Sequence, residues 1–202
     1  AILIIAGNAF ISISMFRLFP DAYTGSLASD LTDIAFSGTT NYFYAAVAFA
    51  LLPAITEEFL FRSVIVAEYE NHGIFTAVVI SSLMFAMVHF NFIKLPSYFF
   101  TGIVLASVMY ASRSVLASIT VHIICNITTL FFDEYLNRLF LNNASGLVLL
   151  HIILAVLTLV FAILFFGEEK SLYKSYSLAN IPSDYRKKPQ QGQLPPLADA
   201  VL

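Results

Sequence analysis

Two adjacent glutamates in an apolar stretch are the first residues of this sequence that could do chemistry. Glu57 and Glu58 lie among Leu, Ala, Ile and Phe residues, where an ionisable group is costly unless it is paired or hydrated. Glu58 and Arg62 are four residues apart with the acid first, the better order for an ion pair on a helix. Glu57 projects about 100° away around that helix and can face a different environment. We therefore expect Glu58 to have a structural role and Glu57 to act as a general base, because burial makes a carboxylate a stronger base.

Three more polar side chains lie in other apolar stretches. His122 and Asn126 are four residues apart and share one face of a helix. Both can donate hydrogen bonds toward one point, as an oxyanion site requires in a low-dielectric environment. His89 follows Phe85 by four residues, so we expect the two side chains to pack together, with His89 holding a water molecule for Glu57. Hydrogen bonding between helices is an alternative role for each lone His or Asn, but it explains two adjacent carboxylates poorly.

The composition indicates that these residues lie within a membrane. Of the 202 residues, 59% are hydrophobic and 11% are charged, whereas soluble proteins contain about 25% charged residues. The net charge of −3 favours neither nucleic acid nor a strongly acidic partner. The single cysteine, Cys125, excludes an intramolecular disulfide and a multi-cysteine zinc site within this sequence, and we interpret it as a small buried apolar residue.

The elements expected to position the polar residues are membrane-spanning helices, each of about 20 apolar residues. Six stretches approach this length, at roughly 1–16, 43–66, 74–93, 95–111, 114–132 and 146–166. We predict an all-α fold, a polytopic transmembrane helical bundle with a polar intramembrane cavity, because lipid-exposed backbone must satisfy its own hydrogen bonds. Pro53 is expected to kink the second helix near the glutamates.

The chain divides into a transmembrane domain over residues 1–167, with its core motifs within 43–132, and a polar tail over 168–202 that we expect to be mostly flexible. Basic residues are enriched in this tail, which predicts a cytoplasmic C-terminus. His151 lies outside the groups described above, and we expect it to pack between helices.

Three short motifs resemble those of a known family. Residues 57–62 (EEFLFR) fit EExxxR, residues 85–89 (FAMVH) fit FxxxH, and residues 122–126 (HIICN) fit HxxxN. In this order, on hydrophobic stretches, they resemble the CAAX protease and bacteriocin-processing (CPBP, Abi) family of intramembrane peptidases, which includes the Ras-converting prenyl-protein peptidase. The resemblance covers about residues 43–132.

The resemblance implies an intramembrane endopeptidase, a hydrolase that depends on glutamate rather than on a metal or another cofactor. Glu57 would activate water, His89 would position it, and His122 and Asn126 would form the oxyanion site. Glu58, Arg62 and Phe85 would be supporting residues. The implied partners are the lipid bilayer and a membrane-associated peptide or protein, prenylated or not, in a bacterial or archaeal plasma membrane.

Other interpretations stay open. Glu57, His89 and His122 could bind zinc, although the sequence has no HExxH motif. A non-catalytic adaptor or bacteriocin-immunity protein could use the same cavity for binding. A proton-coupled transporter could use the three residues as a relay, but the small number of spans and the lack of an internal repeat disfavour it.

Overall fold

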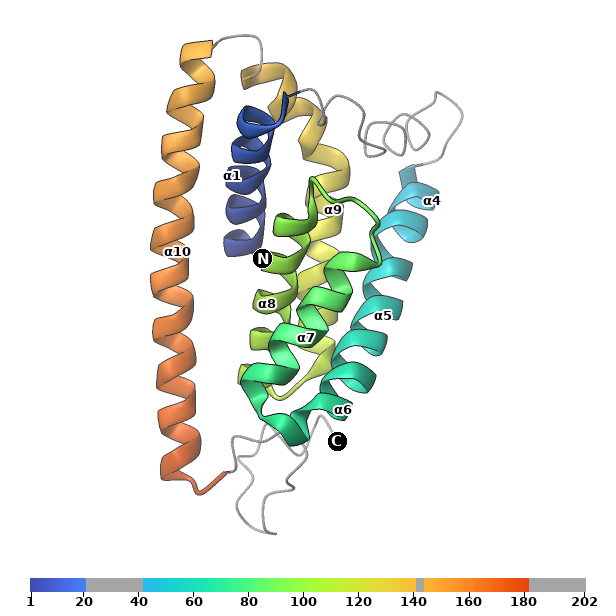
Figure 1. Cartoon of the computed structure of the whole chain (residues 1–202), viewed down its shortest axis with the longest axis vertical. Coiled ribbons are helices and arrows are strands. Elements are labelled where there is room, and N and C mark those ends of the chain that lie inside the picture. The colour runs from blue at the N-terminus through green and yellow to red at the C-terminus, as the bar shows by residue number, and fades with distance from the viewer. Residues whose placement is uncertain (21–41, 141–143, 182–202) are drawn as a thin grey trace.

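Helices dominate the described part of the chain. The computed structural model describes residues 1–20, 42–140 and 144–181, with the backbone alone for 132–140 and 144–145. The predicted all-α fold is confirmed for these residues, whose regular elements are all helices packed side by side (Figure 1).

The described residues form six helical segments, and the second is subdivided. They are α1 (Ile2–Leu18), a continuous helix over Tyr42–His72, α7 (Ile74–Met87), α8 (Leu95–Ser112), α9 (Val115–Phe140) and α10 (Ala144–Leu178). The Tyr42–His72 helix consists of α4 (Tyr42–Ala46), η1 (Val47–Leu51), α5 (Leu52–Glu58), η2 (Phe59–Ile65), α6 (Val66–Tyr69) and η3 (Glu70–His72). Of these, η1 and η2 are π-helical and η3 is a 3₁₀ turn.

Three of the described helices are long and apolar enough to cross a membrane. They are Tyr42–His72, Leu95–Ser112 and Gly146–Leu178, while Ile2–Leu18, Ile74–Met87 and Val115–Phe131 are apolar but shorter. Each of the six predicted apolar stretches therefore forms a helix, and the chain is an integral membrane protein. The prediction of six complete spans stays a prediction.

The third predicted helix ends earlier than expected, and this changes the setting of His89. The apolar run continues to residue 93, but α7 ends at Met87 and leaves His89 in the turn that follows. Phe90 has a positive φ of 49°, which an α-helix cannot accommodate. Pro96, which lacks an N–H and favours the first turn of a helix, then marks the start of α8. Local backbone conformation thus ends the helix where hydropathy alone predicts its continuation.

Helix α8 is the centre of the bundle. Half of its most apolar stretch is buried inside the protein, whereas none of the corresponding stretch of the last helix is buried. Two core clusters lie along it, the first formed by Leu3, Ile4, Val104, Leu105 and Cys125, and the second by Val66, Ala77, Met109 and Tyr110. Burial in the first cluster confirms the expectation for Cys125.

Small residues allow α7 and α8 to approach closely. A Cβ atom on Gly102 of α8 would lie 2.8 Å from the Cβ of Ser82 on α7, so no larger residue fits without displacement. The Oγ atom of Ser81 donates a hydrogen bond to the carbonyl of Phe61 at 3.0 Å. These contacts fix α7 against both α8 and η2.

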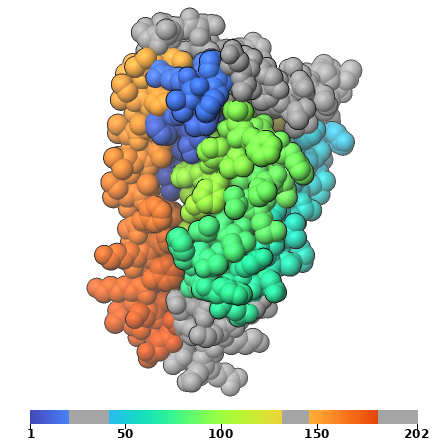
Figure 2. Space-filling model, in the orientation of Figure 1, coloured from blue at the N-terminus to red at the C-terminus, as the bar shows by residue number. Residues whose placement is uncertain are grey.

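The last helix, α10, lies at the edge of the bundle alongside α1 (Figures 1 and 2). His151 lies 3.4 Å from Ser14 Oγ, and its ring packs edge-on against Phe10 with centroids 4.7 Å apart. The expectation that His151 packs between helices is therefore confirmed. The helix extends to Leu178, well beyond the predicted end at residue 166, so the first part of the predicted tail is helical. Residues 182–202 of that tail, and residues 21–41, lie outside the described residues.

Candidate active site

The two glutamates lie where the helix changes its winding. Glu57 and Glu58 end α5, which lies between the π-helical segments η1 and η2. Pro53, in the first turn of α5, has no N–H and cannot continue an α-helical hydrogen-bond ladder. The π-helical segment directly before it accommodates the proline in place of a break in the helix. Such π-helical turns are frequent at functional sites, and these two bracket the acidic pair.

Glu58 is completely buried and is held by three side chains. Its Oε2 lies 3.1 Å from Arg62 Nε, which is the ion pair predicted from the spacing. Ser118 Oγ donates a hydrogen bond to the same oxygen. The other oxygen, Oε1, lies 3.0 Å from His122 Nδ1. A buried carboxylate is stable only with charged and hydrogen-bonding partners of this kind, so the group is a fixed structural unit.

Arg62 extends this unit to the neighbouring helices. Its Nη2 donates a hydrogen bond to the Gly102 carbonyl on α8 at 3.0 Å. Its guanidinium carbon lies 4.8 Å from the ring centroid of Phe85 on α7, within cation–π range. Glu58 and Arg62 therefore connect the Tyr42–His72 helix with α7, α8 and α9.

Glu57 differs from its neighbour in exposure. Its side chain is 24% exposed, whereas that of Glu58 is fully buried. The carboxylate Oε2 lies 3.8 Å from His122 Nε2, beyond hydrogen-bond distance. His89 also lies close enough to interact electrostatically with this carboxylate. The different environments predicted for the two glutamates are therefore present.

His122 lies between the two carboxylates and is itself buried. A carboxylate oxygen accepts hydrogen bonds, so the contact with Glu58 requires the proton on Nδ1. Nε2 is thereby directed toward Glu57. Glu58 thus fixes the orientation of the ring, and in the neutral ring it also fixes the tautomer.

His89 is held in a similar way, by backbone and by an aromatic ring. Its Nδ1 lies 2.8 Å from the Phe85 carbonyl, near the C-terminus of α7, so this nitrogen donates. The ring stacks on Tyr98 of α8, with centroids 3.9 Å apart and planes 20° from parallel. In the neutral ring Nε2 can then accept a hydrogen bond from water or substrate.

Phe85 is the aromatic centre of the site. Its ring is buried, with centroids 5.0 Å from His89, 5.7 Å from His122 and 5.4 Å from Phe61. The expected packing of Phe85 beside His89 is confirmed. One phenylalanine thus sets the spacing between both histidines.

Asn126 is one turn beyond His122 on α9, as its spacing predicts. Its Nδ2 lies 3.4 Å from the Ala50 carbonyl, in the π-helical segment η1. An amide nitrogen carries two hydrogens, so this long contact occupies one donor and leaves a second. Asn126 therefore faces the Tyr42–His72 helix, on the same side of α9 as His122.

Sequence reasoning did not identify several residues of the site, among them Ser118, Tyr98 and Gly102. Ser118 could have been found, because it precedes His122 by four residues and Asn126 by eight, and so lies on the same helix face. Tyr98 and Gly102 contact His89 and Arg62 across helices. No local spacing reports such contacts.

The alternative zinc site can be compared with this geometry. Among the described residues, no group of three His, Cys, Asp or Glu side chains is arranged to hold a metal ion. His89 and His122 direct their Nδ1 atoms at the Phe85 carbonyl and at Glu58, respectively. These contacts leave both Nε2 atoms available, and metal-bound histidines commonly make the same kind of Nδ1 hydrogen bond, so zinc stays an alternative that treatment with a chelator decides.

Part of the chain matches a known protein family. Residues 39–128 match the sequence model of a family described as type II CAAX prenyl endopeptidase Rce1-like. The matched range contains all three motifs and confirms the resemblance that they predicted. No curated protein and no solved structure matches the chain.

Proposed function

We propose that the chain, whose residues 39–128 match the family of Rce1-like type II CAAX prenyl endopeptidases, is a glutamate-dependent intramembrane endopeptidase. Its substrate is a peptide or protein associated with the membrane, and water activated by Glu57 hydrolyses one peptide bond. The C-terminal end of α10 faces the cytoplasm in this proposal, in keeping with the basic residues that follow it.

The contrast between Glu57 and Glu58 carries the proposal. Both oxygens of Glu58 are engaged by Arg62, Ser118 and His122, and its side chain is fully buried, so substrate cannot reach this carboxylate. Glu57 is partly exposed, and His122 and His89 lie around it. A general base must reach the proton it removes, and of the two carboxylates only Glu57 meets this condition.

In the first step Glu57 removes a proton from a water molecule that also donates a hydrogen bond to Nε2 of His89. The water oxygen attacks the carbonyl carbon of the peptide bond, whose π electrons move onto the carbonyl oxygen. Asn126 Nδ2 donates a hydrogen bond to the resulting oxyanion. Nε2 of His122 donates a second one, which requires a proton on both ring nitrogens while Glu58 accepts from Nδ1.

In the second step the tetrahedral intermediate breaks down. The protonated Glu57 gives its proton to the peptide nitrogen, the oxyanion reforms the carbonyl, and the carbon–nitrogen bond breaks. The products are a carboxylic acid and an amine, and Glu57 returns to its ionised form. One water molecule is consumed for each bond cleaved.

The direct test uses quenched-fluorescent peptide libraries, prenylated and unprenylated, with the purified protein in detergent. Wild type should cleave members of at least one library. Glu57→Gln should reduce kcat by about 100-fold to 10,000-fold, the usual contribution of a general base. Glu68→Gln, an exposed glutamate on the same helix, is the matched control and should cleave like wild type.

Other outcomes of this experiment would favour one of the alternative functions or a metal-dependent mechanism. Cleavage that a chelator abolishes would replace the glutamate mechanism by a metal-dependent one. Absence of cleavage by folded wild type in both libraries would favour the adaptor or immunity function. Proton flux into vesicles that is lost in Glu57→Gln, without any cleavage, would favour the transporter.

A further inference from the structure

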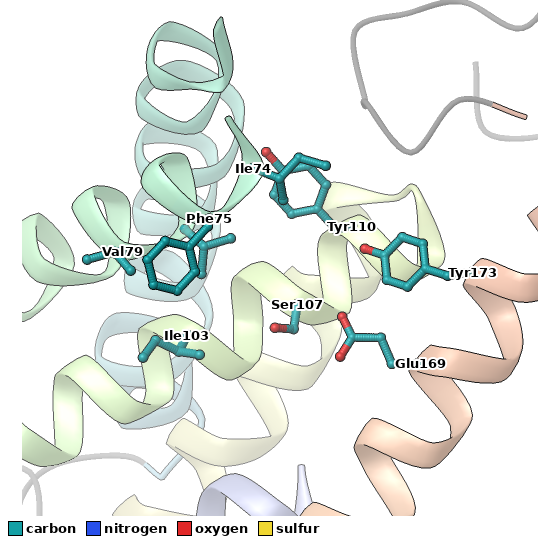
Figure 3. A pocket seen from close by; sticks show the side chains of 9 residues that line it. Ile74, Phe75, Val79, Ile103, Ser107, Tyr110, Glu169 and Tyr173 are labelled. Carbon is teal, nitrogen blue, oxygen red and sulfur yellow. The ribbon is translucent and has the colours of Figure 1, made fainter. Parts of the chain in front are cut away.

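A cleft separate from the glutamate site lies between α10 and the pair α7 and α8 (Figure 3). Its volume is 490 Å³, within the range of about 300–1,000 Å³ that is usual for small-molecule sites. Three elements line it, with Ile74, Phe75, Val78 and Val79 from α7, Ile103, Ser107 and Tyr110 from α8, and Glu169 and Tyr173 from α10. None of these residues belongs to the three sequence motifs.

The cleft changes in polarity along its length. Ile103 lies near the middle of α8 and Tyr110 near its end, which places them about 10 Å apart along the helix axis. Glu169 and Tyr173 follow the apolar part of α10, so they lie where this helix leaves the hydrocarbon region. The inner part of the cleft is therefore apolar, while its outer end carries a carboxylate and phenol groups.

The polar groups of the outer end face the cleft. Glu169 and Tyr173 are four residues apart on one face of α10. Figure 3 shows the carboxylate of Glu169 directed toward Ser107 and the hydroxyl of Tyr173 directed toward Tyr110. Glu169 is half-buried here, whereas its neighbour Glu168 is exposed. The carboxylate is thus a feature of the cleft.

This arrangement has a definite chemical preference. A carboxylate beside aromatic rings attracts an ammonium group, through its charge and through cation–π contacts, and disfavours a headgroup with a net negative charge. The inner part, lined by Val78, Val79 and Ile103, suits a hydrocarbon chain. An amphiphile with an ammonium at its polar end satisfies both parts in the orientation that a bilayer imposes.

We propose that this cleft binds a phospholipid of the surrounding bilayer whose headgroup carries an ammonium. The acyl chain lies along Val78, Val79 and Ile103, and the ammonium is bound by the carboxylate of Glu169. The site is separate from Glu57 and takes no part in peptide hydrolysis. Because α7, α8 and α10 all line the cleft, the bound lipid connects α10 with the core of the bundle.

The test measures bound lipid by native mass spectrometry. Protein is equilibrated in detergent with equal amounts of phosphatidylethanolamine and phosphatidylglycerol, which differ in headgroup charge. Wild type should retain the ethanolamine lipid preferentially. Glu169→Gln should lower this preference about tenfold, as expected when a charged hydrogen-bond partner is lost. Glu168→Gln is the matched control and should leave it unchanged.

A second variant tests the location without removing charge. Ser107→Leu fills the cleft beside Glu169 and should displace the lipid, while thermal unfolding confirms that each variant is folded. Equal retention of both lipids by wild type, preference for the glycerol lipid, or unchanged ethanolamine retention in Glu169→Gln or Ser107→Leu would each overturn the proposal. Because the readout is bound lipid, failure here is distinct from failure of the proposed peptidase activity.

Discussion

The two halves of the glutamate site are built in opposite ways. The Glu58 half is buried, with its carboxylate held by Arg62, Ser118 and His122. The Glu57 half is partly exposed, and its distance to His122 is too long for a hydrogen bond. One turn of helix therefore carries two carboxylates of the same type, one committed to structure and one available for chemistry. The difference predicts that changes in the first half affect stability and changes in the second affect cleavage.

The largest effect on stability is expected for Arg62→Met. This change leaves the buried Glu58 carboxylate without its cationic partner and should lower the free energy of unfolding by about 3–5 kcal/mol. Thermal or denaturant unfolding in detergent measures it. Lys170→Met, on the exposed face of α10, is the matched control. Equal stability of the two variants would contradict a structural role for the pair.

Asn126→Ala should have the largest effect on cleavage after the glutamate itself. Loss of one oxyanion donor should reduce kcat by about 100-fold to 1,000-fold. The free energy of unfolding should change little, because among the described residues Nδ2 makes only one hydrogen bond, the long one to the Ala50 carbonyl. Thr128→Ala, on the same helix and with an exclusively local hydrogen bond, is the comparison. A loss of stability that matches the loss of activity would assign Asn126 to the structural half.

Gly102→Ala tests the close packing of α7 against α8 at the residue whose carbonyl binds Arg62. The added Cβ would lie 2.8 Å from Ser82 Cβ and 2.9 Å from its Cα, so α7 must shift away from α8. We expect a loss of about 1–3 kcal/mol in unfolding free energy. Gly167→Ala, where an added Cβ meets nothing, should be neutral or slightly stabilising.

Ser118→Ala sharpens the comparison by removing the smallest partner of Glu58. Loss of a hydrogen bond to a buried charge should lower the unfolding free energy by about 1.5–3 kcal/mol. Arg62 and His122 still hold the carboxylate, so kcat for the folded protein should fall much less than in Asn126→Ala. A fall in kcat as large as that of Asn126→Ala, with unchanged unfolding, would place Ser118 in the chemical half.

Tyr98 should have the smallest effect. Tyr98→Leu removes the ring stacked on His89, an interaction worth about 0.5–1.5 kcal/mol, and should reduce kcat a few-fold. Tyr98→Phe keeps the ring and should retain more activity than the leucine variant. The reverse order would show that the ring stack does not position His89.

Residue spacing predicted the local contacts of the site well. The pairs Glu58–Arg62 and Phe85–His89 are each four residues apart and are in contact, because a helix or its last turn brings such residues together. Residue spacing could not predict the contacts between helices. The stacking of Tyr98 on His89 and the bond from Arg62 to the Gly102 carbonyl depend on how helices pack, which spacing along one helix does not encode.

Hydropathy located every described helix but not every end. It extended α7 through His89 because the next residues are apolar, although the backbone turns after Met87. It ended the last helix at residue 166, whereas α10 continues through charged residues to Leu178. Hydropathy indicates which residues lie in the membrane, whereas backbone conformation and capping contacts set the ends of the helices.

The most direct test of the account compares Glu57→Gln with Glu58→Gln, measuring peptide cleavage and unfolding on the same preparations. The two changes are identical in chemistry and adjacent in sequence. We predict that Glu57→Gln loses cleavage while unfolding like wild type, and that Glu58→Gln unfolds at a clearly lower temperature. Cleavage that persists in Glu57→Gln, or equal destabilisation by both changes, would contradict the division of the two glutamates between chemistry and structure.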